Sequence, residues 1–258
     1  MRTLLILLFF LPPHIHSAHG SGETSRHRYA DNLNSWIMYF GEIRIHEKVG
    51  IHLEAQWRRS GPLKNPQQVL LRTGVNFHLQ PAIMLTGGYC FVHTSPYGAF
   101  PSPAPFPEHR FWEQLQLKNT FGKVEWTGRL RIEQRFSQLP VGDLETNVFE
   151  PGDAVYTNRF RLMNRVTLPL KGKEILDYTP YLTLYDEIFI NSGRSVEYNF
   201  LDQNRAYLAI GYKLPKVGRL ELGYLEQTIF KPDGIRIERN HTLQLAIVSG
   251  IDLRKPPR

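Results

Sequence analysis

The strongest constraint on the fold is an alternation of polar and apolar side chains with a period of two residues. Between Trp126 and Phe136 (WTGRLRIEQRF), the odd positions carry three arginines and a glutamate, whereas the even positions are mostly apolar. Neighbouring side chains of a β-strand point to opposite faces, so this period indicates a strand with one charged and one apolar face. The apolar face must meet an apolar environment.

The same alternation recurs along the rest of the chain, and no stretch after the first 34 residues has helical periodicity. The runs are found at 35–46, 49–58, 68–79, 82–93, 108–118, 123–136, 156–168, 178–190, 203–213, 218–230 and 236–249. No change of composition divides them, so we expect one all-β domain. These are eleven runs, whereas single-chain bacterial barrels have an even number of strands. We therefore expect ten to twelve strands, with residues 24–33 forming a twelfth or one terminal strand outside the wall.

Strand length distinguishes a membrane barrel from a water-soluble β protein, which would show the same alternation. Strands of soluble proteins average about 5–6 residues, whereas a tilted membrane strand needs about 9–11. Most of the runs reach that length, aromatic residues such as Trp57 and Phe136 lie near their ends, and short connections alternate with long ones. The sequence predicts a single antiparallel transmembrane β-barrel with short periplasmic turns and longer extracellular loops. A soluble periplasmic β protein is the alternative.

The N-terminal stretch has the features of a secretory signal. Arg2 precedes an apolar core at 4–11, a proline pair ends that core, and small residues follow before Ser21. We expect a signal peptide at 1–20, a lead-in at 21–34, the barrel at 35–250 and a C-terminal tail at 251–258. The predicted location is the cell outer membrane. Cys90 is the only cysteine, which excludes an intramolecular disulfide and a lipid-modified cysteine near the cleavage site.

Several blocks of the chain, in order, resemble a known family. They are SWIMYFGEIRI (35–45), LRTGVNF (71–77), EHRFWEQLQL (108–117), RLRIEQRF (129–136), NRFRLMNRVTLPL (158–170), YDEIFIN (185–191), QNRAYLAIGY (203–212) and LELGYLEQ (220–227). The chain resembles domain-of-unknown-function family 2490, the predicted outer-membrane β-barrel proteins of Gram-negative bacteria. The resemblance implies an outer-membrane barrel over nearly all of the mature chain. It implies no activity, so it assigns no catalytic residue.

The charged stripe is the candidate functional feature. Within each run, the residues at alternate positions share one face of the strand, and we call this strand parity. With the short connections in the periplasm, strand parity places nine arginines and five glutamates in the outer half of the interior. The predicted cluster consists of Glu108, Arg110, Arg131, Glu133, Arg135, Arg159, Arg161, Glu187 and Arg205. Buried charges need partners, which favours a structural network. Arginines without a carboxylate would instead form an anion-binding pocket or an anion-favouring constriction, for which Arg131, Arg135, Arg159 and Arg161 are the candidates.

Other kinds of site receive less support. Three histidines lie on the polar face of their strands near the periplasmic ends: His46, His52 and His78. This position makes them candidate metal ligands, but no carboxylate is placed among them. An outer-membrane lipid hydrolase would need a serine beside a histidine, and His241 has no serine on its own run. We therefore expect no enzyme activity and no cofactor.

The predicted partners follow from the location and the charge. A net charge of +7 without any nucleic-acid-binding module points to outer-membrane lipid and the phosphates of lipopolysaccharide, not to DNA or RNA. A small anionic solute is the possible ligand of the arginine cluster. The sequence does not indicate an oligomeric state.

Overall fold

The computed structural model describes residues 27–143 and 145–254, so the predicted signal peptide lies outside the described residues. Eleven strands make up the fold: β1 (Arg28–Arg44), β2 (Val49–Ser60), β3 (Asn65–Gln80), β4 (Ile83–Thr94), β5 (Phe106–Phe121), β6 (Val124–Asp143), β7 (Val148–Pro169), β8 (Pro180–Ser192), β9 (Leu201–Leu214), β10 (Gly218–Phe230) and β11 (Arg236–Asp252). The described residues include no helix that would cross a membrane.

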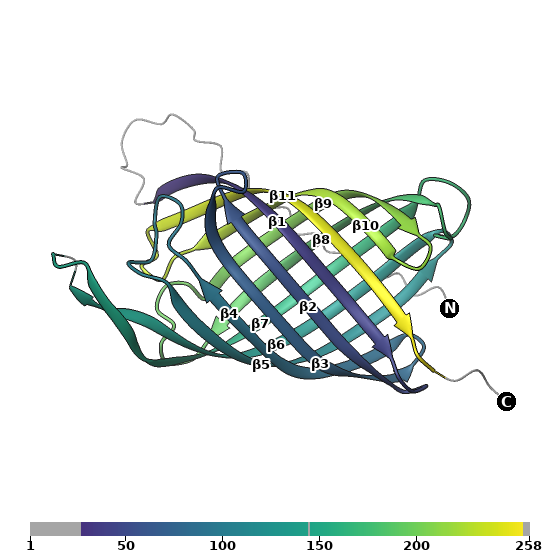
Figure 1. Cartoon of the computed structure of the whole chain (residues 1–258), viewed down its shortest axis with the longest axis horizontal. Coiled ribbons are helices and arrows are strands. Elements are labelled where there is room, and N and C mark those ends of the chain that lie inside the picture. Colours follow the sequence, from purple (N-terminus) through teal and green to yellow (C-terminus); the bar gives the residue numbers. More distant parts are fainter. Residues whose placement is uncertain (1–26, 144, 255–258) are drawn as a thin grey trace.

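The strands form one closed barrel in which each strand pairs with its neighbours in sequence, and β1 pairs with β11 (Figure 1). The prediction of a single all-β barrel of ten to twelve strands is confirmed. One detail is wrong, because β1 and β11 run parallel while the ten other pairings are antiparallel. Hairpins reverse the chain at every step, so an odd number of strands leaves the first and last strands pointing the same way.

The wall begins earlier than predicted. Residues 28–34 extend the first strand and pair with the start of β11, from Arg28 opposite Arg236 onwards. They form neither a separate twelfth strand nor a lead-in outside the wall. At the other end of the chain, β11 continues to Asp252.

The connections gather at two ends of the barrel. The short-turn end carries 45–48, 81–82, 122–123, 170–179 and 215–217, and the loop end carries 61–64, 95–105, the turn between Asp143 and Val148, 193–200 and 231–235. Lengths alternate less regularly than predicted. The expected loop 137–155 is mostly strand, because β6 and β7 continue past the rim as a hairpin that projects from the loop end (Figure 1).

The two faces of the wall differ in the way the alternation predicts. Leu130 is 43% exposed on the outside, whereas its neighbour Arg131 is 2% exposed on the inside. The same contrast holds on β3, where Leu71 is exposed and Arg72 is buried. The outside is therefore mainly apolar, and the inside holds the charged and amide side chains.

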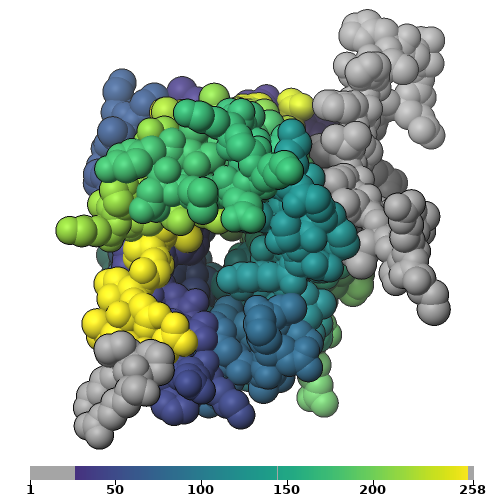
Figure 2. Space-filling view, turned by 90° about the vertical axis from the view of Figure 1, so that its right-hand side faces the viewer, coloured from purple at the N-terminus to yellow at the C-terminus, as the bar shows by residue number. Residues whose placement is uncertain are grey.

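The interior is partly filled and partly hollow. Apolar clusters form around Trp36 and around Trp112, the second of which includes the buried Cys90. A view onto the short-turn end shows an opening at the centre of the mouth (Figure 2). The barrel therefore has a polar interior that is accessible from this end.

Candidate functional site

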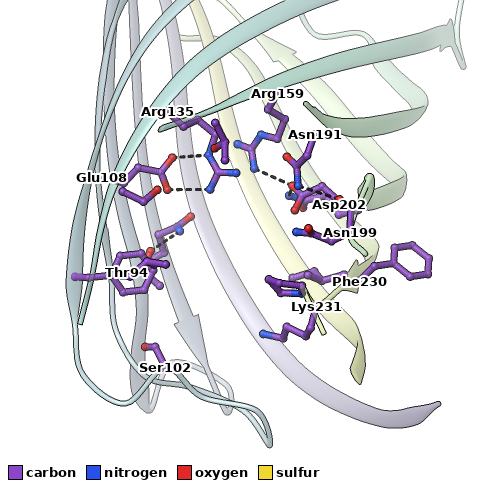
Figure 3. A pocket seen from close by; sticks show the side chains of 18 of the residues that line it. Thr94, Ser102, Glu108, Arg135, Arg159, Asn191, Asn199, Asp202, Phe230 and Lys231 are labelled. Carbon is purple, nitrogen blue, oxygen red and sulfur yellow. Dashed lines mark hydrogen bonds and ion pairs between the residues drawn. The ribbon is translucent and has the colours of Figure 1, made fainter. Parts of the chain in front are cut away.

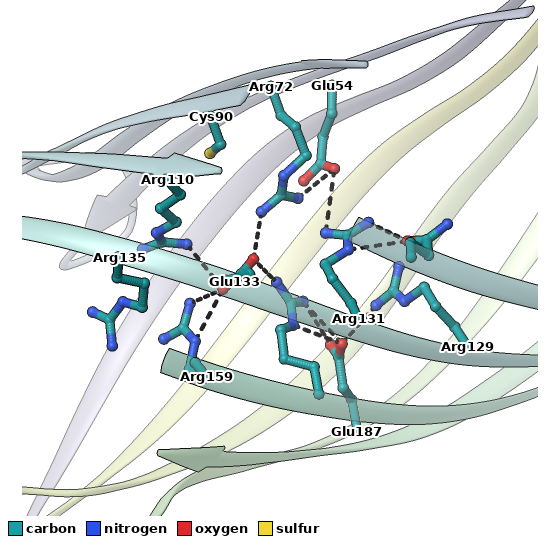
Figure 4. A network of polar contacts seen from close by, with 12 residues as sticks. Glu54, Arg72, Cys90, Arg110, Arg129, Arg131, Glu133, Arg135, Arg159 and Glu187 are labelled. Atoms are coloured by element: carbon teal, nitrogen blue, oxygen red, sulfur yellow. Dashed lines mark hydrogen bonds and ion pairs between the residues drawn. The ribbon is translucent and has the colours of Figure 1, made fainter. Parts of the chain in front are cut away.

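Glu133 is the hub of the charge network inside the barrel. This side chain on β6 is fully buried, and arginines from three other strands surround its carboxylate (Figure 4). Nitrogen–oxygen distances are 2.6 Å to Arg159, 2.8 Å to Arg161, 2.9 Å to Arg72 and 3.6 Å to Arg110. Because these arginines lie on β3, β5 and β7, the contacts cross the barrel as well as joining neighbouring strands.

Two further carboxylates extend the network across the interior. Glu54 on β2 accepts a hydrogen bond from Arg72 at 2.6 Å, so Arg72 bridges two carboxylates. Glu187 on β8 binds Arg129 at 2.6 Å and Arg161 at 2.9 Å. Arg161 is thus a second bridge, and the network continues from β2 to β8.

A third group lies nearer the loop end. Glu108 on β5 pairs with Arg110 at 2.5 Å and with Arg135 at 2.6 Å. Asp202, at the start of β9, pairs with Arg159 at 3.0 Å. Sequence reasoning missed Asp202 because it precedes the predicted run 203–213, and a register shift at Phe189 and Ile190 brings it to the interior.

All nine residues of the predicted cluster are buried or half-buried on the inner face, and eight of them form ion pairs with one another or with neighbouring charges. Each of the four arginines proposed for the constriction has a carboxylate partner. That of Arg131 is the most distant, at 3.9 Å to Glu54, and Arg131 also donates twice to Gln114. Most of the cluster is therefore a compensated network, as the structural interpretation requires.

Arg205 is the ninth member and forms no ion pair with any described carboxylate. Arg58 on β2, which the predicted cluster left out, shares this property. Their guanidinium groups are bonded to glutamine side chains and lie over aromatic rings. Parity alone places both arginines inside, but it does not show which carboxylates are already engaged by other arginines.

Two cavities open from the two ends of the barrel. The loop-side cavity has a volume of about 630 Å³, and the short-turn cavity has about 740 Å³. Gln56, Arg161 and Arg205 line both of them, so the two cavities adjoin at these three side chains. The narrow part of the interior therefore lies beside Arg161 and Arg205.

The two cavities differ in charge. Nine lysine and arginine side chains line the loop-side cavity against two carboxylates. Figure 3 shows these two carboxylates, Glu108 and Asp202, with Arg135 and Arg159 beside them. Eight lysine and arginine side chains line the short-turn cavity against five carboxylates. Carboxylates behind the lining compensate most of the loop-side cations, as Glu133 does for Arg159 and Glu238 does for Lys231. The positive charge of this cavity that has no ion-pair partner among the described residues therefore comes from Arg58 and Arg205, in a confined space where electrostatic interactions are strong.

The proline-rich segment 95–105 covers part of the loop end and lines the loop-side cavity. Tyr97 donates to Glu238 on β11 at 3.3 Å, and Lys231 donates to the carbonyl oxygen of Phe100 at 3.4 Å. Burial and the neighbouring Glu238 carboxylate raise the pKa of the Tyr97 hydroxyl, so this group remains a donor at neutral pH. Gly98 has a φ of +70° and packs against Asn32, a conformation that favours glycine.

The candidate metal ligands do not converge. His78 contacts Glu42 and Arg44, His52 contacts Glu54, and the ring of His46 accepts from the backbone of Lys48. Within residues 27–143 and 145–254, no group of three or more histidine, cysteine or acidic side chains is arranged to hold a metal ion.

The histidine considered for a hydrolase lies on the outer face of β11. His241 contacts the hydroxyl of Tyr224 at 2.6 Å and Asp31 at 3.5 Å. No serine hydroxyl is bonded to a histidine ring among the side chains that the structure describes. The hydrolase alternative therefore gains no support from the geometry.

The model of a family described as "Protein of unknown function (DUF2490)" matches residues 33–238. No curated protein and no solved structure matches the chain.

Proposed function

We propose that this chain, which belongs to the DUF2490 family of proteins of unknown function, is an integral outer-membrane β-barrel of a Gram-negative bacterium with a narrow, anion-favouring interior. The outer wall supports the location. Leu71, Leu162 and Ile210 are among the many large apolar side chains exposed on it. Lipid is the solvent in which such a wall is stable, and a closed barrel leaves no unpaired strand edge in the membrane.

The strand lengths and the N-terminus support the same location. The shortest strands, β2 and β4, have 12 residues, and β7 has 22, whereas a tilted strand crosses a bilayer with about 9–11. The signal-like stretch at 1–20 would direct export. We place the short-turn end in the periplasm and the loop end outside, where the positive charge would meet lipopolysaccharide phosphates.

One observation carries the anion preference. The two cavities adjoin at Arg161 and Arg205, and Arg205 has no carboxylate partner among the described residues. A positive charge that is not compensated by the protein, in a narrow and partly desolvated passage, attracts anions and repels cations. We infer that small anions occupy or cross this part of the interior more readily than cations do.

The location is tested by fractionation, and the selectivity by electrophysiology. The protein should remain in the outer-membrane fraction after a high-salt wash, and release as a soluble periplasmic protein would refute the membrane assignment.

In a planar bilayer with a salt gradient, the reversal potential should have the sign of anion selectivity, and Arg205→Glu should move it towards cations. Arg59→Glu is the control, because Arg59 lies at the rim and lines neither cavity; it donates to backbone carbonyls of 63–64 and lies over the ring of Trp57. Cation selectivity of the unmodified protein would refute the passage.

A sealed structural barrel is the second candidate. The ion pairs around Glu133 favour it, because they join side chains from β3, β5, β6 and β7 across the middle of the interior. This candidate predicts a folded barrel in the outer membrane with no measurable conductance. The bilayer experiment therefore separates the two candidates.

A further inference from the structure

Two buried arginines that line the loop-side cavity form an unusual group with a buried tryptophan in the wall, Trp36. Arg58 is 8% exposed and Arg205 is 7% exposed. Their guanidinium carbons lie 4.0 Å and 5.4 Å from the ring centre of Trp36, so the two groups cannot be further apart than the sum of these distances. Trp36 is itself fixed, because its indole nitrogen donates to Gln67 at 2.8 Å. The three side chains come from β1, β2 and β9, and their mutual contacts preorganise the site.

Both arginines are held by neutral amides. Arg58 donates to Gln56 at 2.9 Å and to Gln68 at 2.7 Å, and Arg205 donates to Gln203 at 3.1 Å. The Nε atom of Arg205 is buried and has no hydrogen-bond partner within the described part of the chain. A buried charge without a counter-charge is costly, and a buried donor without an acceptor adds to that cost.

The neighbouring carboxylates do not compensate these two charges because other arginines engage them. Glu187 lies opposite Arg205 in the pairing of β8 with β9, but its ion pairs are with Arg129 and Arg161. Glu54 is four residues before Arg58 on β2, and its close ion pair is with Arg72. Among residues 27–143 and 145–254, therefore, no carboxylate forms an ion pair with either arginine, and both positive charges are open to an anionic ligand.

We propose that Arg58 and Arg205, which both line the loop-side cavity and both lie over the ring of Trp36, bind an oxyanion of a small hydrophilic solute, either a phosphate or a carboxylate group. Planar guanidinium groups bind both kinds of oxyanion through paired hydrogen bonds. This inference rests on the proposed anion-favouring interior and names the site within it. Cation–π contact with Trp36 keeps the arginines in place when the ligand leaves.

The rest of the cavity fits a small polar ligand. Its volume is about 630 Å³, and Gln203 and Gln227 also line it, which provides amides for hydroxyl groups of the solute. Lys231 and Arg236 lie at the loop-side rim of the same cavity. Both are paired, Lys231 with Glu238 and Arg236 with Asp233, so the attraction for an anion comes from the two arginines deeper in the cavity. The ligand reaches them from the loop end, where the cavity opens.

Calorimetric titration of the folded, detergent-solubilised full barrel tests the site. The probes are inorganic phosphate for the phosphate arm and citrate for the carboxylate arm, at matched ionic strength against sodium chloride. Binding of either probe is expected, and the double variant Arg58→Gln with Arg205→Gln should weaken it by at least about tenfold. Arg219→Gln is the matched control, because Arg219 lines the other cavity and pairs with Glu125 at 2.9 Å. This control should bind the probe as the unmodified protein does.

Thermal unfolding gives a second readout that does not depend on heat of binding. The double variant removes two uncompensated buried charges, so its Tm in anion-poor buffer should equal or exceed that of the unmodified protein. Phosphate or citrate should raise the Tm of the unmodified protein but not that of the double variant. Equal stabilisation by chloride, no binding of either probe, or equal binding by the double variant would overturn the site.

The result of these binding measurements does not depend on whether the barrel conducts ions. Binding without any conductance would keep this site and refute the passage proposed above. Anion-selective conductance without binding would keep the passage and refute this site.

Discussion

Replacing Glu133 with glutamine tests whether the interior network holds the barrel together. Glutamine has nearly the same shape, but it removes the one negative charge that four arginines share at 2.6–3.6 Å. It also directs an NH2 group towards guanidinium donors. Breaking a buried ion pair by removing one partner costs about 3–5 kcal/mol, because the remaining charges stay buried without compensation. We expect Glu133→Gln to lower the free energy of unfolding by that amount.

The matched control is Glu113→Gln on the neighbouring strand. Glu113 lies on the exposed outer face of β5 and accepts a single hydrogen bond from Gln134 at 3.0 Å. Neutralising it disturbs no buried network and removes a charge from the face assigned to lipid, so Glu113→Gln should leave the free energy of unfolding unchanged or raise it. The assay is urea unfolding of the refolded barrel, followed by tryptophan fluorescence and by the heat-modifiable gel mobility of folded barrels.

A double variant separates charge from packing. Arg110 has the longest of the four contacts with Glu133, at 3.6 Å, so adding Arg110→Gln to Glu133→Gln removes one of the surplus positive charges. Recovery of part of the lost stability would show that charge is the cause. Equal destabilisation by Glu133→Gln and Glu113→Gln would refute the reasoning, since it would mean that the hub contributes no more than a surface carboxylate.

Two further predictions concern the wall and the loop end. Leu130→Arg should reduce the yield of folded barrel in membranes far more than Arg129→Leu. A charge on the lipid face near mid-bilayer costs about 2–4 kcal/mol, whereas Glu187 keeps Arg161 as a partner when Arg129 is lost. If gel mobility gave the reversed order of folded yields, the two faces of the wall would be inverted. Deleting 99–104 should leave the folded fraction unchanged, since these residues belong to no strand, and loss of the folded band would show that this segment is required for closure.

Strand parity made the inside and outside of the wall predictable from the sequence. Arg131 and Glu133 are inside, and Leu130 is outside, because the side-chain period of a strand is fixed by backbone geometry. The existence of the strands was equally predictable from the length of the runs. The closed barrel was predictable as well, but the pairing that closes it was not, because the expectation of an even number of wall strands left no place for the parallel pairing of β1 with β11.

The partners inside the barrel were beyond the reach of the sequence. Glu133 meets Arg72 across 61 positions of the chain, and that contact depends on the register of every pairing between β3 and β6. The same limit hid Arg58 and Arg205 as the arginines without carboxylates. These two arginines have no carboxylate partner because other arginines bind Glu54 and Glu187. The alternation within a single strand does not show which arginine binds which carboxylate.

The parallel pairing of β1 with β11 also gives the barrel a mechanical property. Arg28, at the start of β1, lies at the loop end, and Asp252, at the end of β11, lies at the short-turn end. Tension applied between these two points pulls adjacent strands past each other along their lengths. All the hydrogen bonds of the 17-residue seam would then resist the load together, in shear. An even-stranded barrel, whose first and last strands are antiparallel, would instead open like a zipper, one bond at a time, when pulled by its termini.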